Sequence, residues 1–232
     1  MLPQRVQPVG DHRLVAPRST SCLHRPVGLK ELELVLSAEA RGFPPRLLSQ
    51  PIFYPVVDEG YAVQIARDWN TLDEVSGYAG FVTEFDVDAR FIGRFPVQRV
   101  GASNHRELWI PADQLQEFNE HLQSSIRVTQ AFFGANYVGP TPLPIMLKGV
   151  PLHQQLKHLH RIAEYNGMDF ACEVGANWKL ILCNFGWWSS APPERQELSP
   201  EQAAKTLQAI RAVWDKRAVN FPLPRSAHLM AA

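Results

Sequence analysis

The sequence has few cysteines, no excess charge of either sign and no long apolar run. Its cysteines, Cys22, Cys172 and Cys183, are odd in number and lack metal-ligand spacing, which favours a reduced, cytoplasmic setting. Lys and Arg number 23, as do Asp and Glu, so charge alone predicts no tight binding to nucleic acid or anionic membranes. No run approaches the roughly 18 apolar residues of a membrane span. The N-terminal residues lack the continuous apolar stretch of a secretory signal peptide, so no such signal is expected.

The composition that remains is that of an ordinary soluble globular protein. The chain has 232 residues, of which 45% are apolar and 20% charged. This length allows one large domain or two small ones with an ample core. Residues 1–20 are rich in Pro, Arg and polar residues without a period, which predicts a flexible arm.

Residues 21–135 carry the pattern of an α+β domain with many short strands. Alternating or short apolar runs predict strands at 23–27, 52–54, 79–87, 97–100, 106–110 and 126–133. Apolar residues at helical spacing predict helices at 29–40, 58–69 and 111–122. The Pro- and Gly-rich stretch 139–144 is typical of a boundary between domains.

Residues 150–220 predict a second, smaller α-β-β-α domain. Helices are expected at 152–166 and 199–218, with a hairpin of strands 168–174 and 178–185 between them. Cys172 and Cys183 would then lie on opposite arms, and we expect them to be buried free thiols. Trp187 and Trp188 follow the hairpin, where they either seal the two domains together or form a patch for a protein partner.

The candidate functional residues lie near the ends of the short strands. His105 and Glu107 are two residues apart on one predicted strand, so their side chains share a face. Arg25 stands about eighty residues upstream, on the first predicted strand, with His24 beside it. We expect the guanidinium of Arg25 and the carboxylate of Glu107 to meet in one cleft, and the enzymatic interpretation depends on that meeting.

Residues 22–134 resemble the ADP-ribosyltransferase superfamily, in which a split antiparallel β-sheet clamps NAD. The matching stretches, in chain order, are 23–28, 51–55, 61–66, 80–87 and 105–111. The same segment is similar to small uncharacterised bacterial proteins labelled ADP-ribosylation/crystallin-like. The matches there are Phe53-Tyr-Pro-Val, Ile65-Ala-Arg-Asp-Trp-Asn and Trp109-Ile-Pro-Ala.

The resemblance implies a site that takes NAD as co-substrate. Arg25, or His24 in its place, would contact NAD, and Tyr54 or Tyr61 would stack on the nicotinamide. Glu107 would be the catalytic acid, with His105 orienting or deprotonating the acceptor. A carboxylate beside the ribose suits this reaction, because breaking the nicotinamide–ribose bond builds positive charge on the sugar. No metal is expected.

Two departures from the family pattern keep a second interpretation open. His105 stands where many arginine-modifying transferases have Glu or Gln, and Phe53-Tyr54-Pro55 replaces the usual Ser/Thr motif. The alternative is therefore a catalytically inactive binding module, such as an immunity or antitoxin-like partner. For the enzyme, the acceptor is an unknown macromolecule or small molecule. The acceptor could also be RNA or DNA reached by the basic loops; the neutral overall charge argues against tight binding to nucleic acid but not against a transient substrate.

Overall fold

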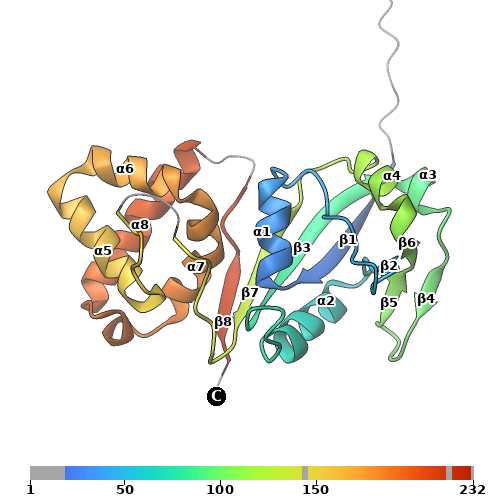
Figure 1. Ribbon diagram of the computed structural model, residues 1–232, viewed down its shortest axis with the longest axis horizontal. Helices are drawn as coiled ribbons and strands as arrows, with labels where there is room; N and C mark the ends of the chain where they lie inside the picture. Colours follow the sequence, from blue (N-terminus) through green and yellow to red (C-terminus); the bar gives the residue numbers. More distant parts are fainter. Residues whose placement is uncertain (1–18, 143–145, 218–220, 231–232) are drawn as a thin grey trace, which may run out of the picture.

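A computed structural model describes residues 19–142, 146–217 and 221–230 of this mixed α/β protein (Figure 1). The predicted arm, residues 1–20, lies outside the described residues except at its end, where Thr20 already begins the first strand. None of the described helices combines the length and apolar character that crossing a membrane requires.

The main sheet has four strands in the order β1-β3-β7-β8. Its strands are β1 (Thr20–Val27), β3 (Ala79–Asp88), β7 (Arg127–Phe133) and β8 (Ser226–Leu229). The first three pair antiparallel, whereas β8 runs parallel to β7. The strand that closes the sheet therefore comes from beyond the C-terminal helices, and the sequence pattern did not predict it.

Two short antiparallel ladders extend the sheet beyond β1. One pairs β2 (Ile52–Phe53) with β6 (Ile110–Pro111), and the other pairs β4 (Val97–Arg99) with β5 (Arg106–Leu108). Val56 connects them to the main sheet, because it forms an isolated antiparallel bridge to His24 on one side and to Glu107 on the other. The predicted strands of this region are thus present, with the 106–110 strand interrupted at Trp109.

Helices cover both faces of the sheet (Figure 1). In the N-terminal part these are α1 (Leu29–Ser37), α2 (Glu59–Ile65), α3 (Ala89–Ile92) and α4 (Leu115–Glu120). A π-helical turn, Ala66–Asn70, continues α2, and a 3₁₀ turn, Ala112–Gln114, precedes α4. The predicted helix 29–40 ends earlier because Glu39 and Ala40 both adopt positive φ angles of 53°.

The two faces of the sheet differ in what they bury. Leu23 and Val27 of β1 belong to the large core together with α1, whereas Val82 of β3 packs with Tyr61 and Ala62 of α2 in a separate small cluster. Alternate residues of a strand point to opposite faces, which explains the division. We call these sides the α1 face and the α2 face.

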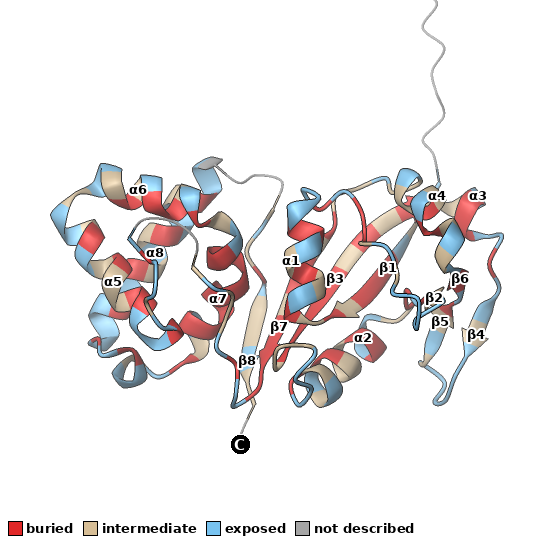
Figure 2. Cartoon of the chain, viewed as in Figure 1, coloured by how far each residue is buried: buried red, intermediate tan, exposed pale blue. Residues whose placement is uncertain are grey.

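The C-terminal unit is helical, so the predicted α-β-β-α arrangement with its hairpin is wrong. Its helices are α5 (Leu152–Tyr165), α6 (Gly167–Ala176), α7 (Trp178–Ser190) and α8 (Pro200–Arg217), with a 3₁₀ turn at Pro193–Gln196. Residues 180–188 of α7 are all buried (Figure 2). A helix that is buried on every side has no amphipathic period. The sequence of such a short apolar run is therefore equally consistent with a strand. Asn177 separates α6 from α7 by hydrogen bonding back to Glu173.

The large core continues from the α1 face into these helices. Trp187 and Trp188 belong to it and are buried, so the interpretation of this pair as an exposed partner-binding patch is wrong. Their sealing of the two domains stays a prediction, because the hydrogen bond of Trp188 and the cation–π contact of Trp187 are with Leu152 and Arg195 of the C-terminal unit. The Tyr137 hydroxyl donates to the Asn184 side chain, which links the segment after β7 to α7. Cys183 is a buried free thiol as expected, whereas Cys172 is exposed.

Candidate functional site

A row of directly opposed residues crosses the sheet on the α2 face. Such residues share a face in an antiparallel ladder. From the outermost ladder to the centre of the sheet, the row consists of Gln98, Glu107, Val56, His24 and Glu84. The backbone of His24 donates to and accepts from Val56, at 2.9 and 2.7 Å. The sheet therefore fixes the two predicted site residues His24 and Glu107 on one face with a single residue between them.

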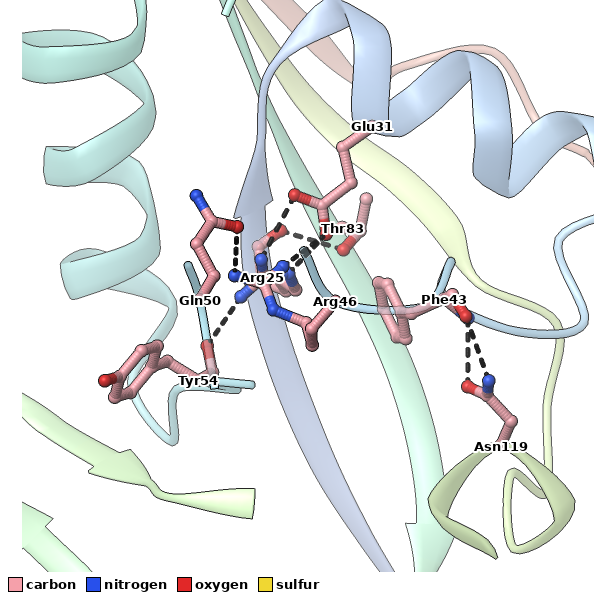
Figure 3. A network of polar contacts seen from close by, with 8 residues as sticks. All are labelled: Arg25, Glu31, Phe43, Arg46, Gln50, Tyr54, Thr83 and Asn119. Carbon is pink, nitrogen blue, oxygen red and sulfur yellow. Dashed lines mark hydrogen bonds and ion pairs between the residues drawn. The ribbon is translucent and has the colours of Figure 1, made fainter. Parts of the chain in front are cut away.

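Arg25 lies on the opposite, α1 face, and the predicted meeting of Arg25 with Glu107 is wrong. It is next to His24 in β1 and opposite Thr83, so its side chain points away from the row. Its guanidinium forms a two-point ion pair with Glu31 of α1, at 2.7 and 3.1 Å, and donates to the Tyr54 carbonyl at 3.1 Å (Figure 3). It also stacks over the Phe53 ring, 4.6 Å from its centre. These contacts make Arg25 part of the core.

A second guanidinium, that of Arg46, lies beside Arg25 (Figure 3). It donates to the Gln50 side chain at 2.8 Å and lies 3.9 Å from the same Glu31 carboxylate. Its buried Nε has no hydrogen-bond partner among the described residues. Burial and the charge of Arg25 lower the pKa of Arg46. The two cations thus share one carboxylate and leave an unbalanced positive charge behind the Tyr54 segment.

Glu107 is held by an aromatic side chain that the sequence analysis did not single out. The Trp109 indole nitrogen donates to the Glu107 carboxylate at 2.7 Å. Trp109 in turn packs edge-on against Tyr54, with ring centres 6.2 Å apart. Trp109 is 44% exposed and Tyr54 37%. The only sequence signal was the i, i+2 spacing of Glu107 and Trp109, which places both on one face if the extended backbone continues.

His105 and Tyr61 form the inner border of this region. Their rings stack with centres 4.2 Å apart, and His105 Nε2 lies 3.0 Å from the Gln64 side-chain oxygen. Burial, and then the nearby charge of Glu107, raise the pKa of Tyr61. Tyr61 is buried beneath His105, so it is not an accessible stacking surface for a ligand. Of the two predicted tyrosines, Tyr54 is the exposed one.

α2 is fixed beside Glu107 by an ion pair. Arg106, the residue before Glu107, binds the carboxylate of Asp58 through two hydrogen bonds of 2.8 Å. Asp58 is the residue that precedes α2, but its side chain does not cap the helix. The pair instead ties the start of α2 to β5, and so keeps Tyr61 next to Glu107.

His24 faces a different set of side chains. Its Nε2 lies 3.7 Å from Glu84 Oε2, and Cys22 is close enough for one ligand atom from each residue to lie within 4.8 Å of the others. Arg127 donates to the other Glu84 oxygen at 2.9 Å. His24 is buried, so the expectation that it contacts NAD has no support from this geometry. The Cys-x-His spacing in a strand is a signal for this cluster, but only the pairing of β1 with β3 adds Glu84.

No protein-family model matches this chain, and the comparisons with curated proteins and with solved structures also find no match.

Proposed function

We propose that this protein is an ADP-ribosyltransferase-like enzyme that takes NAD as co-substrate, through Glu107 and its neighbours and not through the predicted Arg25–Glu107 pair, which does not form. Its site would be the surface formed by Tyr54, His105, Glu107 and Trp109, which we call the Glu107 patch. The observation that carries the proposal is the Trp109–Glu107 hydrogen bond at 2.7 Å, because it orients a carboxylate beside an exposed aromatic ring that packs against a second one, Tyr54. Carboxylates oriented in this way stabilise positive charge that develops in a transition state.

The residues of the patch suit cleavage of the nicotinamide–ribose bond. Since Trp109 occupies Glu107 Oε1, we assign Oε2 to a ribose hydroxyl, beside the positive charge that grows on the sugar as nicotinamide leaves. Tyr54 and Trp109 offer faces on which a nicotinamide or adenine ring can stack. The ADP-ribosyl group would then pass to an acceptor nucleophile or to water.

His105 is assigned to the acceptor. Gln64 Oε1 accepts a hydrogen bond from His105 Nε2, so the lone pair of the neutral ring is on Nδ1. That nitrogen lies over Gly101, where even a Cβ atom would approach it to 2.7 Å. An unprotonated ring nitrogen of this kind can take a proton from an attacking hydroxyl or amine.

The arginine cluster behind Tyr54 supports an anionic ligand. Arg25 and Arg46 share Glu31, and Arg46 Nε is without a partner. The cluster contacts the patch through one residue, since the Tyr54 carbonyl accepts from Arg25 while its ring packs on Trp109. This cluster is on the other side of the sheet from Glu107, so it would bind the pyrophosphate of NAD only where the ligand passes the Tyr54 segment.

Nicotinamide release from NAD tests the proposal, with Glu107→Gln compared against Glu120→Gln. Glu120 is an exposed glutamate of α4, so the control makes the same chemical change on a different element. We expect Glu107→Gln to lower the rate by about 100-fold or more, the scale seen when one oriented polar group is lost from a catalytic site. Equal rates in the two variants would remove Glu107 from the mechanism.

The contribution of Arg46 is tested by NAD affinity in calorimetry. Arg46→Gln is expected to weaken binding by about 10-fold, because it removes one charged contact to phosphate. Arg41→Gln is the control from the same loop, where the arginine is 79% exposed and 3.7 Å from Glu39. Equal affinities in the two variants would exclude the arginine cluster from the NAD site.

The second candidate function is the catalytically inactive binding module. It is favoured by the internal contacts of three predicted site residues, since Arg25, His24 and Tyr61 are all buried. The same calorimetry separates the candidates: a wild-type chain that neither binds NAD nor releases nicotinamide would contradict the enzyme and leave the Glu107 patch as a surface for a macromolecular partner.

A further inference from the structure

A mixed set of metal-ligand side chains meets on the α2 face, on the other side of Val56 from Glu107. Cys22 and His24 are two residues apart in β1, and Glu84 is directly opposite His24 in β3. One sulfur, one imidazole nitrogen and one carboxylate oxygen from these residues all lie within 4.8 Å of each other. We propose that Cys22, His24 and Glu84 form a zinc-binding site.

The ligand types select the metal. Thiolate, imidazole and carboxylate together suit Zn²⁺, whereas Mg²⁺ and Ca²⁺ prefer oxygen ligands alone. Atoms bound to one tetrahedral zinc ion lie about 3.3 to 3.7 Å apart, given zinc–ligand distances of about 2.0 to 2.3 Å. His24 Nε2 and Glu84 Oε2 are already 3.7 Å apart. Cys22 is exposed, so its side chain has room for the small movement that would bring its sulfur to zinc-binding distance beside the other two ligand atoms.

The sheet holds two of the ligands in place before any metal arrives. His24 is only 7% exposed, and its backbone is bonded to Val56 in both directions. Arg127 binds Glu84 through Oε1, which leaves Oε2 as the oxygen on the side of His24. A metal site built on paired strands loses little conformational freedom when it binds.

The charges around the cluster also balance with a divalent cation. Three negative charges are present, on the Cys22 thiolate, Glu84 and the neighbouring Asp86. They equal the two positive charges of a zinc ion and the one positive charge of Arg127. Arg127 lies 3.7 Å from Asp86 as well as bonding to Glu84. Arg225 and Glu59, the next charged groups that act on these residues, are opposite in sign. Three protein ligands leave the fourth position for water.

The site is tested with Zn²⁺ and Co²⁺ on the full chain. We expect one tightly bound metal per chain in competition with a chromophoric chelator. With Co²⁺ we expect the near-ultraviolet absorption of a thiolate–cobalt bond. Cys22→Ser should abolish that absorption and weaken zinc binding by at least about 100-fold, beyond the range for loss of an outer-shell partner. Glu84→Gln, which keeps the shape of the side chain, should weaken binding by about 10-fold or more.

Cys172→Ser is the matched control, because Cys172 is the other exposed cysteine and lies on α6. It should bind zinc and cobalt like the wild type. A cobalt–thiolate absorption that survives in Cys22→Ser, or disappears in Cys172→Ser, would overturn the proposal. So would a wild-type chain that binds no stoichiometric zinc. Circular dichroism of each variant is measured before the metal titration, to establish that the variant is folded.

Discussion

Arg25 and Glu31 join the first strand to the first helix through two hydrogen bonds, on the face of the sheet opposite Glu107. The pair is largely removed from solvent, and the guanidinium also donates to the Tyr54 carbonyl. Arg25 therefore holds α1, β1 and the Tyr54 segment together. Its charge serves the fold, and any effect on a ligand passes through Tyr54.

We predict that Arg25→Ala destabilises the protein by about 2 to 3 kcal/mol, because it leaves the Glu31 carboxylate without its charged partner. Urea denaturation followed by circular dichroism measures this change. Arg41→Ala is the control, since that side chain is exposed, and it should change the unfolding free energy by less than about 0.5 kcal/mol. Similar midpoints for the two variants would show that Arg25 is not structural.

Two glycines of the N-terminal part are predicted to respond in opposite directions to the same change. A Cβ at Gly80 would lie 2.0 Å from the Ala66 carbonyl oxygen, because the π-helical turn after α2 rests on β3 at this point. Gly80→Ala should therefore displace that turn and lower the melting temperature strongly. A Cβ at Gly60 of α2 would meet no described atom within 4 Å, so Gly60→Ala should stabilise the helix by up to about 1 kcal/mol.

Thermal unfolding by calorimetry checks both glycine variants in one buffer. A Gly80→Ala protein as stable as the wild type would mean that α2 does not rest on the sheet as closely as described. The position of α2 matters for the Glu107 patch, because α2 supplies Tyr61 and Gln64 to His105.

Tyr137→Phe is predicted to cost about 1 kcal/mol of unfolding free energy, the usual net value of one hydrogen bond. The hydroxyl donates to Asn184 at 2.7 Å inside the core, so its loss leaves a buried amide oxygen with one partner fewer. Tyr165→Phe is the matched control, because Tyr165 is 86% exposed. Chemical denaturation with equal midpoints for the two variants would contradict the link between the β7 segment and α7.

The ion pair beside the patch predicts a pH effect. Hydrogen bonds from Arg106 are the main reason why the pKa of Asp58 lies below its ordinary value of 3.8. A lowered pKa in the folded state means that the pair stabilises the protein above the ordinary aspartate range. That contribution is lost as the pH falls through the lowered pKa.

Carboxyl NMR titration should therefore show the pKa of Asp58 rising towards 3.8 in Arg106→Gln. Arg94→Gln serves as the control, because Arg94 binds Glu117 and lowers the pKa of that group instead. An Asp58 pKa that is the same in wild type and Arg106→Gln would mean that the pair does not form in solution.

The sequence predicted the N-terminal helices and strands well but the C-terminal hairpin wrongly. The difference lies in how clearly each segment shows a periodic pattern of apolar residues. The residues in the second half of β3 alternate between buried and less buried, and the apolar residues of α1 recur at helical spacing. Each sequence pattern therefore indicates its own secondary structure. Residues 180–188 are buried on all sides in α7 and have no polar face to set a period. Only the surrounding helices decide that this run is helical.

For the candidate site too, part of the arrangement could be predicted from the sequence and part could not. The spacing of His105 and Glu107 predicted without knowledge of the fold that they share a face, since strand geometry acts over two residues. The same spacing extends to Trp109, which the sequence analysis did not single out. Which face Arg25 takes relative to Glu107 depends on the bridges through Val56, and these join segments far apart in the chain.

By itself the amino-acid sequence determined the strands and helices of residues 21–135, because periodicity and turn residues act over short distances. The tertiary structure alone decided that β8 completes the sheet, that Arg25 turns to α1, and that Glu84 meets Cys22 and His24. Those outcomes depend on strand register and on helix packing, which bring together residues too distant in the chain for any local pattern to connect.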